Sequence, residues 1–349
     1  MKTVFVVDDS ETNRVKAKNV LEKEYAAYAL PSAAKMFKLI EKITPDLILL
    51  DIDMPEMDGF KVIEMLKADP RYKSIPVIFL TAKRDPGAEI RGFELGVIDF
   101  IGKPFSPPVL VKRIQSHLEN DKLIKKSLKA VQDLHNATIG VIANLVESRD
   151  KITGKHIERT QTYLKILIDE LVRTGVYADE ILSWDMSLLL PSAQLHDVGK
   201  IVISDTILNK TGKFTDEEFE IIKTHSSEGE NIINEIINKT TEEDDFLIHA
   251  KRFAGSHHEK WNGRGYPRGL TGEEISLEGR IMAIADVYDA LVSDRPYKKA
   301  FSHEQAVDII TNDSGTHFDP KIVNAFLDVA DDFEVESLRL RVAEKYHEL

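Results

Sequence analysis

With 349 residues, of which 42% are hydrophobic and 30% charged, the chain is long enough for two domains with separate cores and is not disordered. It contains no cysteine, which excludes disulfides, thiol nucleophiles and thiolate metal ligands, so a bound metal must be held by His, Asp or Glu. A net charge of -13 argues against a nucleic-acid partner, and the lack of a long apolar run or signal segment argues against a membrane, so we expect a cytoplasmic protein.

Residues 1–120 alternate short apolar runs with segments of helical spacing. The runs at 4–7, 46–50 and 77–80 are typical of parallel strands that are buried on both faces. Helical spacing between them, at 33–43 and 60–68, predicts crossover helices. The alternation predicts a doubly wound α/β domain with a parallel sheet.

Polar side chains follow these runs, at the points where the predicted strands end. Asp8 and Asp9 follow the first run, Asp51 the next, and Thr81 and Lys103 follow later ones. The carboxyl ends of parallel strands form the sites of open α/β sheets, so we expect these residues to meet. Three neighbouring carboxylates repel one another and need a hard cation such as Mg²⁺. Asp51 is then the expected phosphate acceptor, with Lys103 neutralising the phosphoryl group and Thr81 donating a hydrogen bond to it.

Together these residues resemble the receiver domains of response regulators, which have a flavodoxin-like fold, over the whole of residues 1–120. The matching segments are Asp8-Asp9, Asp51 with Met54-Pro55 and Asp58-Gly59, Thr81-Ala82, and Lys103-Pro104-Phe105. The resemblance implies that Asp51 is phosphorylated and that the partner is a cognate sensor histidine kinase. It also implies that Phe100 acts as an aromatic switch residue.

From residue 107 to residue 145 the pattern changes to apolar residues three or four apart, with charges between them. The row consists of Leu128, Val131, Leu134, Thr138, Val141 and Leu145. This row predicts a long helix that joins two domains, with 121–146 as the signalling linker, and it is suited to pairing with a second copy in a homodimer. The alternative is a last receiver helix, a bend and then an unrelated helix.

Beyond Glu147 the chain reads as helical throughout, and clustered histidines and acids are its main feature. The candidate metal ligands are His156, His196, Asp197, His225, His257, His258 and Asp286. Asp286 lies in an apolar helical run, where a buried carboxylate costs several kcal/mol unless it is paired or binds metal. Imidazole and carboxylate without thiolate suit Fe, Mn, Zn or Ni better than Ca.

If Asp197 bridges two metals, the seven residues form two sets of four. His156, His196 and Asp286 complete one set, and the other histidines complete the second. Two metals about 3.5–4 Å apart can activate water and clamp a phosphodiester. Lys200 follows His196 by four residues, which places both on one face of a helix, where Lys200 could stabilise the charge that develops on phosphate.

Residues from about 140 to 330 resemble the HD-GYP family of bacterial phosphodiesterases. The matching segments are Ser148-Arg149-Asp150 through Arg159, His196 through Lys200, His257-His258-Glu259 through Gly265-Tyr266-Pro267, Asp286 through Leu291, and Arg295-Pro296-Tyr297-Lys298. The resemblance implies an all-helical HD-type metallohydrolase domain, at 147–349, that opens cyclic di-GMP to pGpG and in some members onward to GMP. It implies iron or manganese at the seven ligands, Lys200 and Asp197 as catalytic residues, and substrate contacts from Tyr266, Arg295 and Lys298.

One departure from the family pattern concerns the number of metals. Some members have a Glu four residues before the first ligand histidine and use it for a third metal, but here that position is Ile152. We therefore expect two divalent metals per site. Asp150 and Glu147 stand six and nine residues before His156, offsets that do not share its helical face.

Two other functions remain open at this level. One is a weakly active effector that binds cyclic di-GMP and signals through protein contacts, including contacts with a diguanylate cyclase. The other is a hydrolase of a different cyclic dinucleotide. In either case we expect phosphorylation of Asp51 to control the second domain.

Overall fold

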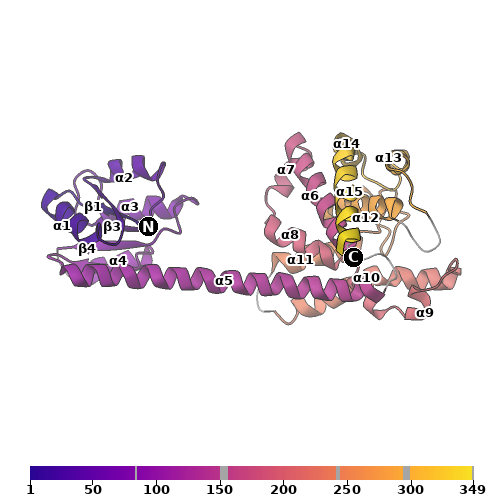
Figure 1. Cartoon of the computed structure of the whole chain (residues 1–349), viewed down its shortest axis with the longest axis horizontal. Coiled ribbons are helices and arrows are strands. Elements are labelled where there is room, and N and C mark those ends of the chain that lie inside the picture. The colour runs from indigo at the N-terminus through magenta and orange to yellow at the C-terminus, as the bar shows by residue number, and fades with distance from the viewer. Residues whose placement is uncertain (83–84, 150–155, 241–243, 294–298, 348–349) are drawn as a thin grey trace. The chain divides into compact units, whose positions relative to one another are not determined.

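The computed structural model describes residues 1–82, 85–149, 156–240, 244–293 and 299–347, with side chains to Leu340 (Figure 1). The chain divides into two compact units, Met1–Val131 and Gln132–Leu349. The residues from the sequence analysis that lie outside the described part are Asp150, Ile152, Arg295, Pro296, Tyr297 and Lys298.

The first unit is a five-stranded parallel sheet with helices between its strands. The strands are β1 (Thr3–Val7), β2 (Ala26–Leu30), β3 (Leu47–Asp51), β4 (Val77–Thr81) and β5 (Asp99–Gly102), and the helices are α1 (Glu11–Leu21), α2 (Ala33–Ile40), α3 (Gly59–Ala68) and α4 (Pro86–Glu94). The strand order is β2-β1-β3-β4-β5, which confirms the doubly wound prediction. Strand β2 is only partly buried, and the sequence analysis did not identify its short run of Ala, Tyr and Leu as a strand.

Alternate residues of the central strands fill two separate cores, one on each face of the sheet. Phe5 and Ile48 lie in one core, whereas Val4 and Leu47 lie in the other. Because the strand order reverses between β1 and β3, the carboxyl ends of these neighbouring strands form a crevice. Asp8 and Asp51 are therefore brought together at one edge of the sheet.

Helix α5 (Pro107–Arg149) is a single helix of 43 residues, which confirms the predicted long helix rather than the alternative with a bend. Its start packs on the first unit through Leu110 and Ile114, and its last turns bury Ile139 in a core of the second unit. The row that suggested pairing is exposed at Leu128, Val131, Leu134, Val141 and Leu145. Homodimer formation through this row stays a prediction.

The second unit is helical. Its α-helices are α6 (His156–Thr174), α7 (Ala178–Ile181), α8 (Met186–Ser192), α9 (Asp205–Leu208), α10 (Asp216–Ile237), α11 (Asp245–Ser256), α12 (Leu277–Val292), α13 (His303–Asn312), α14 (Pro320–Asp328) and α15 (Ala330–His347). Short 3₁₀ helices are η1 (Ala193–Leu195), η2 (Val198–Val202) and η3 (Gly272–Glu274). Isolated bridges are the only β pairing among the described residues of this unit, which confirms the all-α prediction.

Helix α12 lies at the centre of the second unit. It is buried on almost every side, so it has apolar residues all round, and it also carries four charged residues, Glu278, Arg280, Asp286 and Asp289. Its Tyr288 packs edge-on against Tyr163 of α6 and Phe333 of α15. This central position carries Asp286 into the interior. None of the described helices has the length and apolarity that crossing a membrane requires.

Candidate functional site

The His196-Asp197 pair lies between two 3₁₀ helices rather than at the end of an α-helix. His196 caps η1 and Asp197 precedes η2, and the amide of Lys200 donates to the carbonyl of Asp197 at 2.9 Å. The expectation that His196 and Lys200 share an α-helical face is therefore wrong. In a 3₁₀ turn residues three apart are aligned, and Nζ of Lys200 lies 2.8 Å from Oδ2 of Asp197.

Helix α10 carries His225 and packs directly against η2. A capping box between Thr215 and Glu218 starts the helix, which satisfies its first amides. A Cβ at Gly199 would stand 1.9 Å from the carbonyl oxygen of His225 and 2.4 Å from the amide of Gly229. Glycine at 199 is thus required for the backbone contact that brings Asp197 beside His225.

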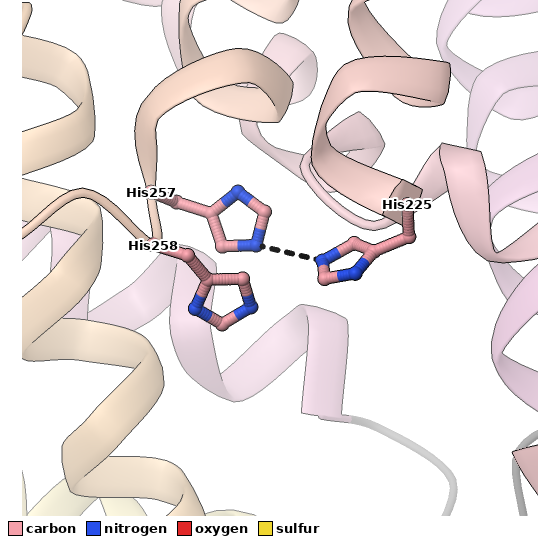
Figure 2. A group of neighbouring side chains, drawn as sticks. All are labelled: His225, His257 and His258. Carbon is pink, nitrogen blue, oxygen red and sulfur yellow. Dashed lines mark hydrogen bonds between the residues drawn. The ribbon is translucent and has the colours of Figure 1, made fainter. Parts of the chain in front are cut away.

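Six of the seven predicted metal ligands fall into two groups, in each of which the ligand atoms lie within 4.8 Å of one another. The first group is His225, His257 and His258, in which Nε2 of His225 and Nε2 of His257 are 3.4 Å apart (Figure 2). The second is His156, His196 and Asp286, in which Nε2 of His156 lies 3.5 Å from Oδ1 of Asp286. The three-dimensional fold thus reproduces the two sets that the sequence suggested.

The seventh predicted ligand, Asp197, lies between the two groups. Its Oδ2 is 3.4 Å from Nε2 of His196, and its Oδ1 is 3.4 Å from Nε2 of His225 and 3.9 Å from Nε2 of His257. Each carboxylate oxygen therefore faces a different group. This arrangement is the one that a bridging carboxylate needs.

Four of the histidines have their Nδ1 atoms engaged away from the centre. The contacts are His156 to Oδ2 of Asp289 (2.8 Å), His196 to the carbonyl of Ala193 (2.9 Å), His225 to that of Ile222 (2.7 Å) and His257 to that of Phe253 (2.9 Å). A ring that donates from Nδ1 has its Nε2 lone pair available for a metal. The outer partners therefore orient the ligand atoms inward.

Asp289 and Arg159 form a buried pair beside His156, and the sequence analysis gave them no role beyond their place in the matching segments. Nε of Arg159 donates to Oδ1 of Asp289 at 2.7 Å, and both side chains are buried. Although burial opposes it, hydrogen bonds from His156 and Arg159 lower the pKa of Asp289. The available signal was the spacing, because Asp289 follows Asp286 by three residues on one helix.

The donor set fits a pair of divalent transition metals. Nε2 of His196 is buried and makes no well-formed hydrogen bond within the described part of the chain. Burial, together with the charge of His196, lowers the pKa of His257 to about 3, and burial also lowers the pKa of His258. Burial alone would raise the pKa of Asp197, but the charges of Lys200 and His196 hold it well below its ordinary value. Neutral imidazoles and an ionised carboxylate are the forms that bind metal, and His257, His258 and Asp197 favour them. Although burial opposes it, the charge of Asp197 raises the pKa of His196, so His196 must give up its proton when a metal binds.

Tyr266, a predicted substrate contact, borders the first group. Its ring centroid is 4.8 Å from that of His258, and Nζ of Lys223 lies 5.9 Å from the ring. Glu259 holds the loop by accepting the amides of Arg268 at 2.8 Å and Leu270 at 3.0 Å. Burial raises the pKa of Tyr266, so its hydroxyl remains a donor.

Glu147, at the end of α5, lies beside the second group. Its Oε1 accepts the amide of His156 at 3.1 Å, and burial raises its pKa. It lines a cavity of about 20 Å³ together with His156, His196 and Asp197. Glu147 lies on α5 and His156 on α6, so the expectation that their spacing of nine residues keeps Glu147 away from His156 does not apply. The number of metals stays a prediction.

The predicted receiver residues also come together. Ligand atoms of Asp8, Asp9 and Asp51 lie within 4.8 Å of one another, and Nζ of Lys103 is 2.7 Å from Oδ2 of Asp8 and 2.6 Å from Oδ2 of Asp51. Burial raises the pKa of Asp51 despite the contact with Lys103. Buried carboxylates that crowd one lysine have oxygen ligands to offer a Mg²⁺ ion.

Thr81 and Phe100 line one open cleft of about 550 Å³ in the first unit. The ring of Phe100 packs edge-on against Phe79 at 5.6 Å and Phe93 at 5.0 Å. A Cβ at Gly92 would stand 2.5 Å from this ring, so α4 and the ring are in close contact. Thr81 and Phe100 therefore share the lining of one cleft, and the switch role of Phe100 stays a prediction.

Two family models match the chain, the response regulator receiver domain at residues 4–115 and the HD domain at residues 140–322. A protein of Vibrio cholerae serotype O1 named "Probable cyclic di-GMP phosphodiesterase" is 41% identical over 93% of this chain and 77% of its own length. The cyclic di-GMP phosphodiesterase response regulator RpfG of Xanthomonas campestris pv. campestris is 33% identical over 93% and 86%. A 3'3'-cGAMP-specific phosphodiesterase of Vibrio cholerae is 35% identical over 64% and 40%.

Proposed function

This chain belongs to the family of HD-domain cyclic di-GMP phosphodiesterases that carry a response regulator receiver domain, and on that premise we propose that it hydrolyses cyclic di-GMP under the control of phosphorylation at Asp51. The observation that carries the proposal is Asp197, whose two oxygens face two separate groups of ligand side chains. A site of this shape suits the cleavage of a phosphodiester.

The second unit is proposed to hold two divalent metals, iron or manganese. His156, His196, Asp197 and Asp286 would hold one, and Asp197, His225, His257 and His258 the other. Bound there, such a pair activates water and neutralises the charge of the phosphodiester. In the reaction water adds to phosphorus, the bond from phosphorus to the 3′-oxygen breaks, and that oxygen takes a proton, which gives pGpG. A second cleavage of the same kind gives GMP.

The protein's own residues position and stabilise the reacting phosphate. Lys200 is held by Asp197 at 2.8 Å, and its ammonium is proposed to offset the negative charge that develops on the phosphate oxygens. The protonated hydroxyl of Tyr266 is proposed to donate to the substrate. Arg295 and Lys298 are proposed as further substrate contacts, because arginine can bind a phosphate or a guanine edge through two parallel hydrogen bonds.

Mutation of the shared ligand tests this function. Asp197→Ala removes the carboxylate from both groups, so turnover of cyclic di-GMP by anaerobically purified, metal-loaded protein should fall to background. The matched control is Asp169→Ala, which removes an exposed acid of α6 that pairs with Lys165. Wild-type turnover in Asp197→Ala would show the bridging assignment to be wrong.

A hydrolase of another cyclic dinucleotide is the second candidate, supported by the similarity to a 3'3'-cGAMP-specific phosphodiesterase. Rates should be compared on cyclic di-GMP and 3'3'-cGAMP with the same metal loading. We expect the larger kcat/KM on cyclic di-GMP. The reverse order would favour the second candidate, and binding without turnover of either would favour an effector.

Control by the first unit is proposed to start at Asp51. A kinase-derived phosphoryl group adds charge beside Mg²⁺ at Asp8 and Asp9, recruits Thr81 and shifts the surface that contains Phe100. Phosphorylation of Asp51 is proposed to change homodimer formation along α5. Contacts with a diguanylate cyclase are proposed as a further interaction. Rate and oligomeric state should be compared with and without beryllofluoride, using Asp51→Asn as the control. Identical values in both states would exclude this control.

A further inference from the structure

The last residue of α5, Arg149, contacts residues 200–205, the segment that follows the His196-Asp197 pair. Its guanidinium donates to the carbonyl oxygens of Lys200 at 3.3 Å, Ile201 at 2.6 Å and Ile203 at 2.9 Å. It also pairs with Oδ1 of Asp205 at 2.8 Å. Four acceptors within one six-residue stretch are thus gathered by a single side chain.

A second hydrogen bond connects the end of α5 to the region after η2, this time with Arg149 as the acceptor. The side-chain amide of Asn209, just after α9, donates to the carbonyl of Arg149 at 2.9 Å. The last carbonyls of a helix lack partners within the helix, so this hydrogen bond fixes the end of α5. Both contacts lie within the second unit.

The segment that Arg149 contacts, residues 200–205, includes Lys200 and lies close after Asp197. Helix η2 follows Asp197 directly and contains Lys200, and its packing on α10 depends on Gly199. Two residues earlier on α5, Glu147 accepts the amide of His156. The end of α5 therefore contacts the backbone amide of His156, in the second ligand group, and the backbone carbonyls of the segment that follows Asp197.

We propose that Arg149 is a positioning residue that couples the end of α5 to Asp197 and Lys200. A displacement of the end of α5 would move the four acceptors of Arg149 together, and with them the ligand and the lysine. Arginine is required because its planar fork offers five donors, whereas lysine offers one compact charge that cannot reach four acceptors at once. This inference rests on the proposed function for its effect on rate, but not for its effect on the order of η2.

Amide hydrogen exchange of residues 198–203 in the full-length protein, read by mass spectrometry, tests the coupling without any substrate. We expect faster exchange in this segment in Arg149→Ala and Arg149→Lys than in the wild type. The control is Arg173→Ala, which removes an exposed arginine of α6 that is paired with Glu170. Exchange at the wild-type rate in both Arg149 variants would refute the proposal.

Kinetics provide the second readout. In the Arg149 variants kcat should fall roughly 10- to 100-fold with little change in KM, because a small misplacement of catalytic groups affects the chemical step most. The difference in rate and in exchange with and without beryllofluoride should disappear in these variants and persist in Arg173→Ala. Persistence of the beryllofluoride effect in Arg149→Ala would overturn the coupling.

The two proposals fail in different ways. If the wild type does not hydrolyse cyclic di-GMP but exchange at 198–203 depends on Arg149, the proposed function is wrong and the positioning role stands. If Arg149→Ala does not fold, exchange at 198–203 is measured in Asn209→Ala instead. This variant removes the hydrogen bond to the carbonyl of Arg149 and leaves no charge unpaired. Unchanged exchange in Asn209→Ala and Arg149→Lys would then count against the role.

Discussion

The imidazole of His156 donates from Nδ1 to Oδ2 of Asp289 at 2.8 Å, and its Nε2 is thereby directed toward Asp286. Asp289 is 1% exposed and also accepts a hydrogen bond from Arg159. A single carboxylate therefore orients His156 and neutralises the buried guanidinium of Arg159. Ligand histidines are commonly held in this way by an outer carboxylate.

Asp289→Asn tests this relationship. The amide cannot accept from both His156 and Arg159 as a carboxylate does, so metal affinity at the second ligand group should fall roughly 10- to 100-fold. Loss of the charge that neutralises Arg159 should also lower the free energy of unfolding by about 3 kcal/mol. Metal titration and denaturant unfolding measure the two effects.

Glu278→Gln is the matched control for that variant. Glu278 is buried and accepts hydrogen bonds from His249 at 2.8 Å and Arg252 at 2.9 Å. Like Asp289, it is thus a carboxylate bonded to one histidine and one arginine, but it belongs to neither ligand group. It should lose stability while its metal content stays at two per chain. Equal metal loss in both variants would mean that Asp289 acts only on the fold.

Lys200→Met should keep both metals and lose catalysis. The thioether fills a similar volume but carries no charge, so the developing charge on phosphate is left unbalanced and kcat should fall by roughly 10²–10³. The metal-to-protein ratio by elemental analysis should match the wild type. A normal kcat in a fully loaded variant would remove Lys200 from the mechanism.

Gly199→Ala should prevent the site from assembling. The new Cβ would meet the backbone of α10 at 1.9 Å, and backbone cannot move aside as a flexible side chain can. We expect a lower thermal midpoint and a metal content below one per chain. Gly212→Ala, where a Cβ meets nothing within 4 Å, is the control and should resemble the wild type in both measurements.

His317 should make the free energy of unfolding depend on pH. Burial, and then the charge of Lys260, lower its pKa in the folded state to about 4, against 6.5 in the unfolded chain. The unfolded state therefore binds the proton more readily, so stability is complete above pH 6.5 and is lost as the pH falls toward 4. His317→Gln does not titrate and should lose less stability over this range, by on the order of 2 kcal/mol at pH 4.5. Denaturant unfolding of both proteins at pH 7 and 4.5 measures the difference, and parallel losses would contradict it.

Much of the first unit was readable from local pattern, and the exceptions have physical causes. Strands β1, β3 and β4 are buried on both faces, so their sequences are continuously apolar and easy to recognise. Strand β2 lies at the edge of the sheet and is half-exposed, and three of its five residues are alanine, which is depleted in strands, so its apolar run was a weaker signal.

The candidate site shows the same division. The sequence by itself determined which side chains could hold metal, because a cysteine-free chain leaves only His, Asp and Glu, and their clustering with acids in apolar runs was visible. It did not determine that His196-Asp197 stands between 3₁₀ turns, that Asp289, Arg159 and Glu147 form the contacts around His156, or that Arg149 contacts the segment after Asp197. Those contacts join residues from 9 to 133 positions apart in the chain. Only the tertiary structure decided them, because hydrogen bonds between distant segments depend on how helices pack, and helix packing depends on close backbone approaches such as that of Gly199 to α10.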